Sequence, residues 1–251
     1  MKICLRTPSL VCLVLLVVGG ACGVSPISRN VTIPNVYYVP LHSLPYDRGF
    51  YVDGELPQLR NAGASGSILN KQLRSIGEQA IRQSENSVRP TSGPLVGGGQ
   101  FGITPIPRLI FANSILVSML LPAFDRRPYG VSNPFWVSVT LEMSSPHQNI
   151  GIGDLIKASG FPSLAKTLRQ RLERNKCMMV LNKNYLATVT APRLASFQQF
   201  ALLQTGLAIG FPSSSSFPPY NCGAFDVIIP YSEIASDMSP VGKALAIDVA
   251  K

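Results

Sequence analysis

The chain has 251 residues, of which 46% are hydrophobic and 14% are charged, and its formal net charge is +9. This length is enough for one large domain or two small ones with a buried core, and the apolar content excludes a chain that is disordered throughout. With 21 glycines and 21 prolines, the composition is typical of a loop-rich protein that contains strands rather than of a helical bundle.

The first residues indicate an export signal. Lys2 and Arg6 form a positive start, Leu10 to Val18 is an unbroken apolar run, and small residues follow it. A run of this length is too short to span a bilayer, so the pattern predicts a cleaved signal peptide over residues 1–23 and a secreted, periplasmic or cell-surface protein. The alternative is a lipoprotein in which Cys22 is the lipid-modified first residue. No later segment is predicted to cross a membrane.

Signal removal leaves two cysteines, Cys177 and Cys222. In an oxidising compartment such an isolated pair is a disulfide candidate, and two unpaired thiols are the alternative. Loss of Lys2 and Arg6 also reduces the net charge from +9 to +7. Outside the cell the available polyanions are wall polymers, lipid headgroups and acidic glycans, so a nucleic-acid partner is not expected.

After a Pro-rich lead-in over residues 24–49, one folded domain is expected over residues 50–245. Its first strand is predicted at Phe50 to Leu59, followed by a turn with Ser67 as a candidate N-cap. Residues 68–85 have the periodicity of an amphipathic helix. Its apolar face consists of Leu69, Leu73, Ile76 and Ala80.

The segment from Asn86 to Arg108 has the Gly/Pro composition of a long exposed loop. A second amphipathic helix is predicted at Pro162 to Lys176, where Leu164, Leu168 and Leu172 recur every four residues. The remaining strands are predicted over residues 109–121, 135–143, 197–203, 206–211 and 224–234. Strands that follow strands through short turns favour an α+β fold, with antiparallel sheets and two amphipathic helices packed on them.

The stretch "FQQFALLQTGLAIGF", followed after a polar interval by "CGAFDVIIPYSEI", resembles the closing segment of a bacterial extracytoplasmic family. "FYVDGELPQL", "ILNKQLRSIGEQA" and "VTLEMSSPHQNIGIGDLI" are similar to earlier pieces in the same order. This is the RsiV/PdaC-type domain of unknown function, which occurs in the anti-sigma factor RsiV, in the peptidoglycan deacetylase PdaC and in secreted mycobacterial immunogenic antigens. The resemblance covers roughly Phe50 to Met238 and implies an envelope-associated or secreted bacterial protein.

One departure from the family pattern concerns a Gly-Gly-x-His-Pro motif that many members carry. The matching stretch here runs from Gly130 through Asn133 to Pro134, so an asparagine stands where relatives have histidine. Any chemical role of that histidine is absent from this chain. A turn role for Gly130, Asn133 and Pro134 is expected to survive, because asparagine also favours turns.

No motif in the sequence predicts catalysis. The histidines His42 and His147 have no ligand-forming neighbours at metal-binding spacing, and neither an HExxH nor a G-x-S-x-G motif is present. No cofactor, metal site or catalytic residue is therefore predicted. The best binding candidate is the basic face of the second helix, and its alternative is an ordinary solvated face. This face consists of Lys166, Arg169, Arg171 and Arg174.

These features predict a non-catalytic binding module, monomeric and located outside the cytoplasm. The expected partner is a cell-wall glycan or an extracellular protein, such as a lysozyme-type partner, because the resemblance includes RsiV, which binds lysozyme. An immunogenic surface protein is a third interpretation that no residue separates from the first. The alternative from another class is a secreted esterase or hydrolase acting on esters or wall substituents, an activity proposed for some secreted relatives.

Overall fold

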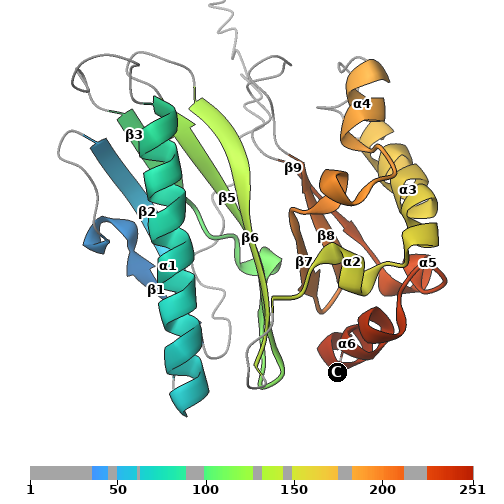
Figure 1. The fold of residues 1–251 in the computed structure, drawn as a ribbon, viewed down its shortest axis with the longest axis horizontal. Coiled ribbons are helices and arrows are strands. Elements are labelled where there is room, and N and C mark those ends of the chain that lie inside the picture. Colours follow the sequence, from blue (N-terminus) through green and yellow to red (C-terminus); the bar gives the residue numbers. More distant parts are fainter. Residues whose placement is uncertain are drawn as a thin grey trace, which may run out of the picture.

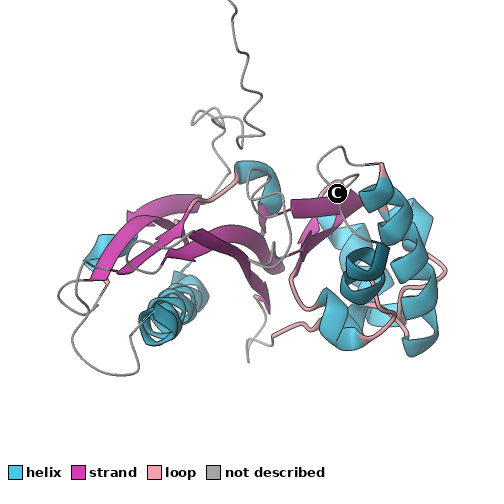
Figure 2. Cartoon of the chain, turned by 90° about the horizontal axis from the view of Figure 1, so that it is seen from above, coloured by secondary structure: helices cyan, strands magenta, loops and turns pink. Residues whose placement is uncertain are grey.

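The computed structural model describes residues 36–44, 50–60, 63–88, 99–126, 132–143, 149–174, 183–211 and 225–250. They form an α+β fold in which two bodies lie side by side (Figure 1). The first body is a six-stranded sheet with one long helix on it. The second body is a three-stranded sheet whose helices gather mostly on the side away from the first body (Figure 2).

The first body contains one helix, six strands and two short 3-10 helices. Its elements are β1 (Val36–Pro40), η1 (Leu41–Ser43), β2 (Phe50–Leu59), α1 (Gly63–Val88), β3 (Gly99–Ile103), η2 (Pro107–Leu109), β4 (Ile110–Ala112), β5 (Leu116–Arg126) and β6 (Ser132–Glu142). The strand order is β1-β2-β3-β5-β4, and β6 pairs with the other side of β5. The strand predicted at Phe50–Leu59 is confirmed with its bounds as β2, but it is not the first, because β1 lies within the predicted lead-in and pairs with β2. The apolar face of α1 packs on the sheet, with Leu69 and Leu73 buried.

The first sheet is mixed rather than antiparallel, because β2 and β3 pair in parallel. A parallel pair needs a crossover connection, and α1 lies in the chain between these two strands. The Asn70 side chain fastens the helix to the sheet. Its Oδ1 accepts from the Leu59 amide at 2.8 Å, and its Nδ2 donates to the Leu59 carbonyl at 3.0 Å.

The predicted loop from Asn86 to Arg108 is wrong in part. The helix α1 continues to Val88, and β3 is a buried central strand between β2 and β5. Glycine suits this strand because Gly102 lies under a ring of β5. A Cβ there would come within 2.3 Å of the Phe124 ring. The N-cap prediction at Ser67 is also wrong, since α1 begins at Gly63.

Among the described residues, the second body contains three antiparallel strands in the order β7-β8-β9, five α-helices and two short 3-10 helices. Its elements are α2 (Ile152–Leu155), η3 (Ala158–Gly160), α3 (Phe161–Glu173), α4 (Lys183–Val189), η5 (Leu194–Phe197), β7 (Phe200–Leu203), β8 (Gly206–Phe211), β9 (Phe225–Ile229), α5 (Tyr231–Ile234) and α6 (Pro240–Ala250). The amphipathic face predicted for α3 is confirmed, because Leu164, Leu168 and Leu172 are fully buried.

The prediction that a strand over residues 224–234 is the last element of the fold is wrong. The strand β9 lies at the sheet edge and ends before Pro230, and two helices, α5 and α6, follow it. The sequence did not predict helix α6, because the helix is apolar on most sides and lacks the polar stripe that reveals helical periodicity. Val241 and Ile247 are exposed while Leu245 is buried. Within the ranges that the structure describes, no helix combines the length and apolar character needed to span a membrane.

The two bodies meet in a sealed contact that we call the joint. Its buried core consists of Ile106, Leu109, Leu120, Trp136, Ala201, Leu203 and Ala208. The indole of Trp136 packs over Gly210 of β8, and its Nε1 donates to the Phe211 carbonyl at 3.1 Å. A side chain at position 210 would collide with that ring, because its Cβ would lie 2.7 Å away.

Buried hydroxyls complete the joint. The backbone amide of Leu202, on the outer edge of β7, donates to Ser118 Oγ at 2.7 Å. Ser118 Oγ in turn lies 2.8 Å from Thr140 Oγ1. At the rim, the Arg108 guanidinium holds the Asp226 carboxylate with two hydrogen bonds of 2.5 and 2.7 Å. This hydrogen bonding raises the pKa of Arg108.

Candidate functional site

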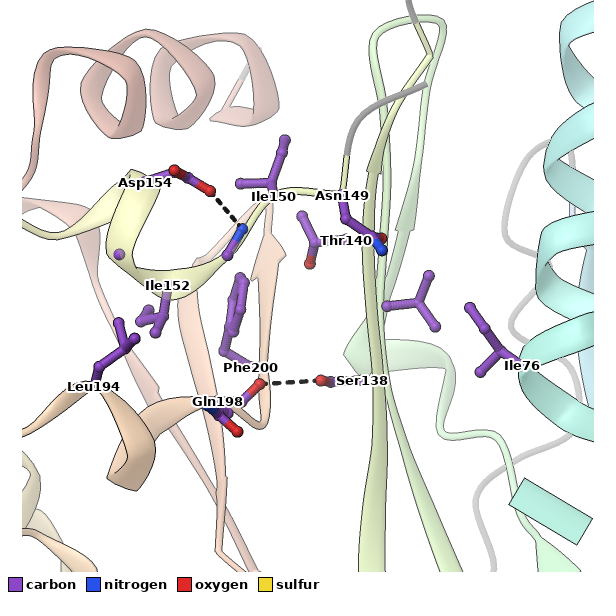
Figure 3. Close-up of a pocket in the computed structure, with 13 residues that line it drawn as sticks. Ile76, Ser138, Thr140, Asn149, Ile150, Ile152, Asp154, Leu194, Gln198 and Phe200 are labelled. Carbon is purple, nitrogen blue, oxygen red and sulfur yellow. Dashed lines mark hydrogen bonds between the residues drawn. The ribbon is translucent and has the colours of Figure 1, made fainter. Parts of the chain in front are cut away.

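A cleft of about 560 Å³ opens beside the joint, between the same two bodies (Figure 3). One wall is Ile76 of α1, and the opposite wall comes from the start of α2, from η5 and from β7. The strand β6 runs between the walls. The lining residues are Ile76, Ser138, Val139, Thr140, Asn149, Ile150, Gly151, Ile152, Gly153, Asp154, Leu194, Gln198 and Phe200.

The cleft follows an edge of β6 rather than a face of the sheet. Successive side chains of a strand point to opposite faces. Val139 belongs to the core under α1, whereas Thr140 reaches Ser118 in the joint. Since residues from both faces line the same cleft, the cleft must lie along the strand edge between them.

That edge has no partner strand, because β6 pairs with β5 alone among the described strands. The outward direction of its backbone groups can be worked out. Ile150 N–H donates to the Thr140 carbonyl at 2.9 Å, so the groups of Thr140 point away from β5. In a strand this direction repeats every second residue, so the N–H and C=O groups of Ser138 and Trp136 also point outward.

The opposite side of the ladder gives the same alternation. Thr104 N–H donates to the Pro122 carbonyl at 3.1 Å, and Pro122 pairs with Trp136 in the β5–β6 register. The carbonyl of Pro122 therefore points away from β6. In a non-hydrogen-bonded antiparallel pair both residues point away from each other, so Trp136 points away from β5.

The cleft has a mixed apolar and polar lining and little charge. Among the described residues that line it, Asp154 is the one ionisable residue. Its Oδ2 accepts from the Gly151 amide at 2.7 Å, which leaves the second carboxylate oxygen for other contacts (Figure 3). Ser138 Oγ donates to the Gln198 carbonyl at 3.1 Å across the cleft. Phe200 is the one aromatic lining residue, and it is buried.

One hydroxyl of the cleft is already engaged inside the protein. Ser138 Oγ donates to a carbonyl oxygen, and the described residues that line the cleft include no imidazole beside it. His42 lies in η1 on an exposed surface, and His147 is outside the described residues. In the part of the chain that the structure describes, no three His, Cys, Asp or Glu residues come together to hold a metal ion.

The predicted basic face of α3 is partly used inside the protein. Arg171 forms an ion pair of 2.6 Å with Glu233, and Arg169 Nε donates to Thr190 Oγ1 at 3.1 Å. Lys166 and Arg174 are exposed. Two of the four cations therefore stabilise contacts of α3 with its neighbours, and a ligand role for the face stays a prediction.

The other predicted site residues do not reach the cleft. Asn133 and Pro134 continue the strand as early residues of β6. Gly130 lies outside the described residues. So do Cys177 and Cys222, which form the predicted disulfide, and Cys22, the lipidation candidate. The cleft residues escaped the sequence analysis because Ser138, Thr140 and Gln198 carry no motif. Their one signal was the alternation of β6, which does not reveal whether a strand lies at an edge.

No profile of a known protein family and no curated protein matches this sequence. Among solved structures, a crystal structure of a DUF3298 family member from Bacteroides fragilis matches with a TM-score of 0.55 and 11% sequence identity. The match covers 86% of this chain and 96% of that chain. A DUF3298 family protein from Pseudomonas aeruginosa PAO1 matches with a TM-score of 0.48 and 11% identity, over 84% of this chain and 96% of that one.

These observations define the fold of the chain. The chain has the α+β fold of the Bacteroides DUF3298 structure over most of its length. At 11% identity the likeness says nothing of ligands. The more specific resemblance to the RsiV/PdaC-type family stays a prediction.

Proposed function

We propose that this chain is a non-catalytic binding module that acts outside the cytoplasm, and that the cleft beside β6 is its ligand site. The observation that carries this proposal is the cleft itself. Its volume of about 560 Å³ lies within the roughly 300–1,000 Å³ common for ligand sites. The joint fixes both walls, so the site is preformed rather than assembled on binding.

The export pattern of residues 1–23 supports an extracytoplasmic location. There, the candidate ligands are a cell-wall glycan or an extracellular protein such as a lysozyme-type partner. The RsiV/PdaC-type resemblance supports the same group of ligands. The neutral hydroxyl and amide groups of the cleft offer hydrogen bonds to either of them.

Retention of residues 24–251 on immobilised peptidoglycan and on immobilised lysozyme at low salt tests this proposal. Leu194 lines the cleft and is 48% exposed, so Leu194→Glu places a charge in the site without disturbing the core. Ile247→Glu is the matched control, because Ile247 is 60% exposed on α6 and does not line the cleft.

We expect one of the two matrices to retain the wild-type chain and the Ile247→Glu variant, and we expect Leu194→Glu to weaken that retention at least tenfold. Unchanged retention of Leu194→Glu would place the ligand elsewhere. Failure of both matrices to retain the wild-type chain would contradict the proposal. So would turnover of p-nitrophenyl esters that Ser138→Ala abolishes, since that result would favour a hydrolase.

A further inference from the structure

Among the described residues, the chain itself pairs with the outer edge of β6 at one end only. Asn149 forms an antiparallel bridge with Leu141, and Ile150 N–H donates to the Thr140 carbonyl. The backbone then leaves the edge at Gly151, because α2 begins at Ile152. The first step of an added strand is therefore already present. The edge continues past it through Ser138, which lines the cleft, to Trp136 and Pro134.

The remaining edge offers a regular row of backbone groups. Ile150 already lies opposite Thr140, so the outward groups that remain are both groups of Ser138, both groups of Trp136 and the carbonyl of Pro134. None of them forms a hydrogen bond with another described residue. Pro134 has no N–H to donate, so pairing ends there. From Pro134 to Ser138 the edge extends about 13 Å at the usual rise of a strand.

Such an edge favours a peptide backbone over a glycan. Unpaired N–H and C=O groups at strand spacing match another extended chain and attract one. Glycan sites, in contrast, commonly stack sugars on aromatic rings, and Phe200, the aromatic lining residue, is buried. A second copy of this chain fits poorly, because its β6 edge would be recessed between the same two walls.

The two walls also set a side-chain pattern. Alternate side chains of an added strand point to opposite sides. One side meets Ile76 and Val139, which are apolar, and the other side meets Gln198 and Asp154. The described lining residues include one carboxylate and no cation, so the second side favours neutral or basic residues.

We propose that the cleft binds an extended segment of another protein, which adds a strand to the outer edge of β6 between Pro134 and Ser138. Its apolar side chains contact Ile76 and Val139, and a lysine or arginine on the other side lies near Asp154. This inference rests on the proposed function, because it names the ligand class of that same cleft.

The probe is the synthetic peptide acetyl-Val-Lys-Val-Lys-Val-amide, titrated into the ¹⁵N-labelled 24–251 chain and followed by NMR. We expect the amide signals of Trp136 and Ser138 to shift and their hydrogen exchange to slow. N-methylation of alternate peptide residues provides the backbone control. Methylation in one alternation should abolish binding, whereas methylation in the other should leave it within about threefold, since only one set of amides can face β6.

Two pairs of matched comparisons complete the test. Replacing both lysines of the peptide by glutamates should weaken binding at least tenfold, and Asp154→Asn should remove most of that difference while keeping an acceptor for Gly151. Ser138→Ala removes the bond to Gln198 but keeps the edge amide. Ser138→Pro removes that amide as well, and it should lower the affinity at least tenfold below that of Ser138→Ala.

Peptide binding that is equally sensitive to methylation in both alternations, or that shifts signals away from β6, would overturn the inference. A shift of the Ser138 signal by a chitooligosaccharide and not by the peptide would overturn it too. If the peptide does not bind while Leu194→Glu still abolishes retention on peptidoglycan or lysozyme, the inference fails and the proposed function stands. If Ser138→Pro does not fold, the methylated peptides decide the question.

Discussion

The joint and the cleft lie next to each other between the same two bodies, and they treat exposed strand edges in opposite ways. In the joint, the outer edge of β7 is satisfied, because the Leu202 amide donates to a buried hydroxyl of Ser118. In the cleft, the outer edge of β6 beyond Thr140 has no such partner among the described residues. One strand, β6, contributes to both regions. The side chains of Trp136 and Thr140 pack in the joint, whereas Ser138 lines the cleft.

This comparison separates structural polar groups from groups that are kept for a ligand. A buried polar group without a partner costs stability, so a sealed contact must satisfy every one. The joint does so with Trp136 Nε1 and the Ser118–Thr140 pair. Ser138 is partly exposed where it lines the cleft, so its unpaired backbone groups cost little and remain able to bind. Variants of the joint should therefore change stability, and variants of the cleft should change binding.

The largest effect is expected for Trp136→Ala. It removes the ring that packs over Gly210 and leaves the Phe211 carbonyl without its donor, so the free energy of unfolding should fall by about 3–5 kcal/mol. Denaturant titration followed by circular dichroism measures it, because Trp136 is the one tryptophan. Trp136→Phe keeps part of the packing and should lose less. A loss below 1 kcal/mol for Trp136→Ala would mean that the joint does not hold the bodies together.

Ser118→Ala and Ser138→Ala form a sharper pair, one serine from each region. Ser118→Ala leaves the buried Leu202 amide unsatisfied, so unfolding should become easier by about 1–3 kcal/mol. Ser138→Ala removes an exposed hydrogen bond to Gln198 and should stay within about 0.5 kcal/mol of the wild type. The same denaturant titration measures both variants. Equal losses in their free energies of unfolding would contradict the distinction between joint and cleft.

A smaller effect is expected from alkaline pH, through Tyr231. Its hydroxyl donates to the Leu203 carbonyl at 2.8 Å, and burial raises its pKa above the ordinary value of 10.0. Because the unfolded chain loses this proton first, the contribution of Tyr231 is complete below pH 10 and declines as the pH rises above it. Tyr231→Phe should therefore be less stable at pH 8 by about 1 kcal/mol, the value of one hydrogen bond.

The difference in stability between the wild type and Tyr231→Phe should shrink as the pH rises above 10. Thermal melts of the two proteins between pH 8 and pH 11 measure it, and their comparison cancels the titration of the other tyrosines. A difference that stays constant over this range would show that the Tyr231 proton is not held by the fold.

Local pattern accounts for much of the fold. The strands β2 and β8 have the predicted bounds, and the buried faces of α1 and α3 follow from their leucine spacing. The pattern failed where the tertiary context decides. Glycine-rich β3 is a strand because Gly102 lies under Phe124, and α6 packs without a polar stripe. The cleft could not be predicted from local pattern at all. It lies along a strand edge, and an edge can be identified only when the pairing of all strands is known.

The most direct test of this account compares two backbone amides, that of Leu202 in the joint and that of Ser138 in the cleft, by hydrogen exchange in the ligand-free 24–251 chain. The account predicts that the Leu202 amide is strongly protected, because it is buried and bonded to Ser118. The Ser138 amide should exchange orders of magnitude faster, since it faces the cleft without a partner. Equal protection of the two amides would show that the β6 edge is already paired, and would contradict the account.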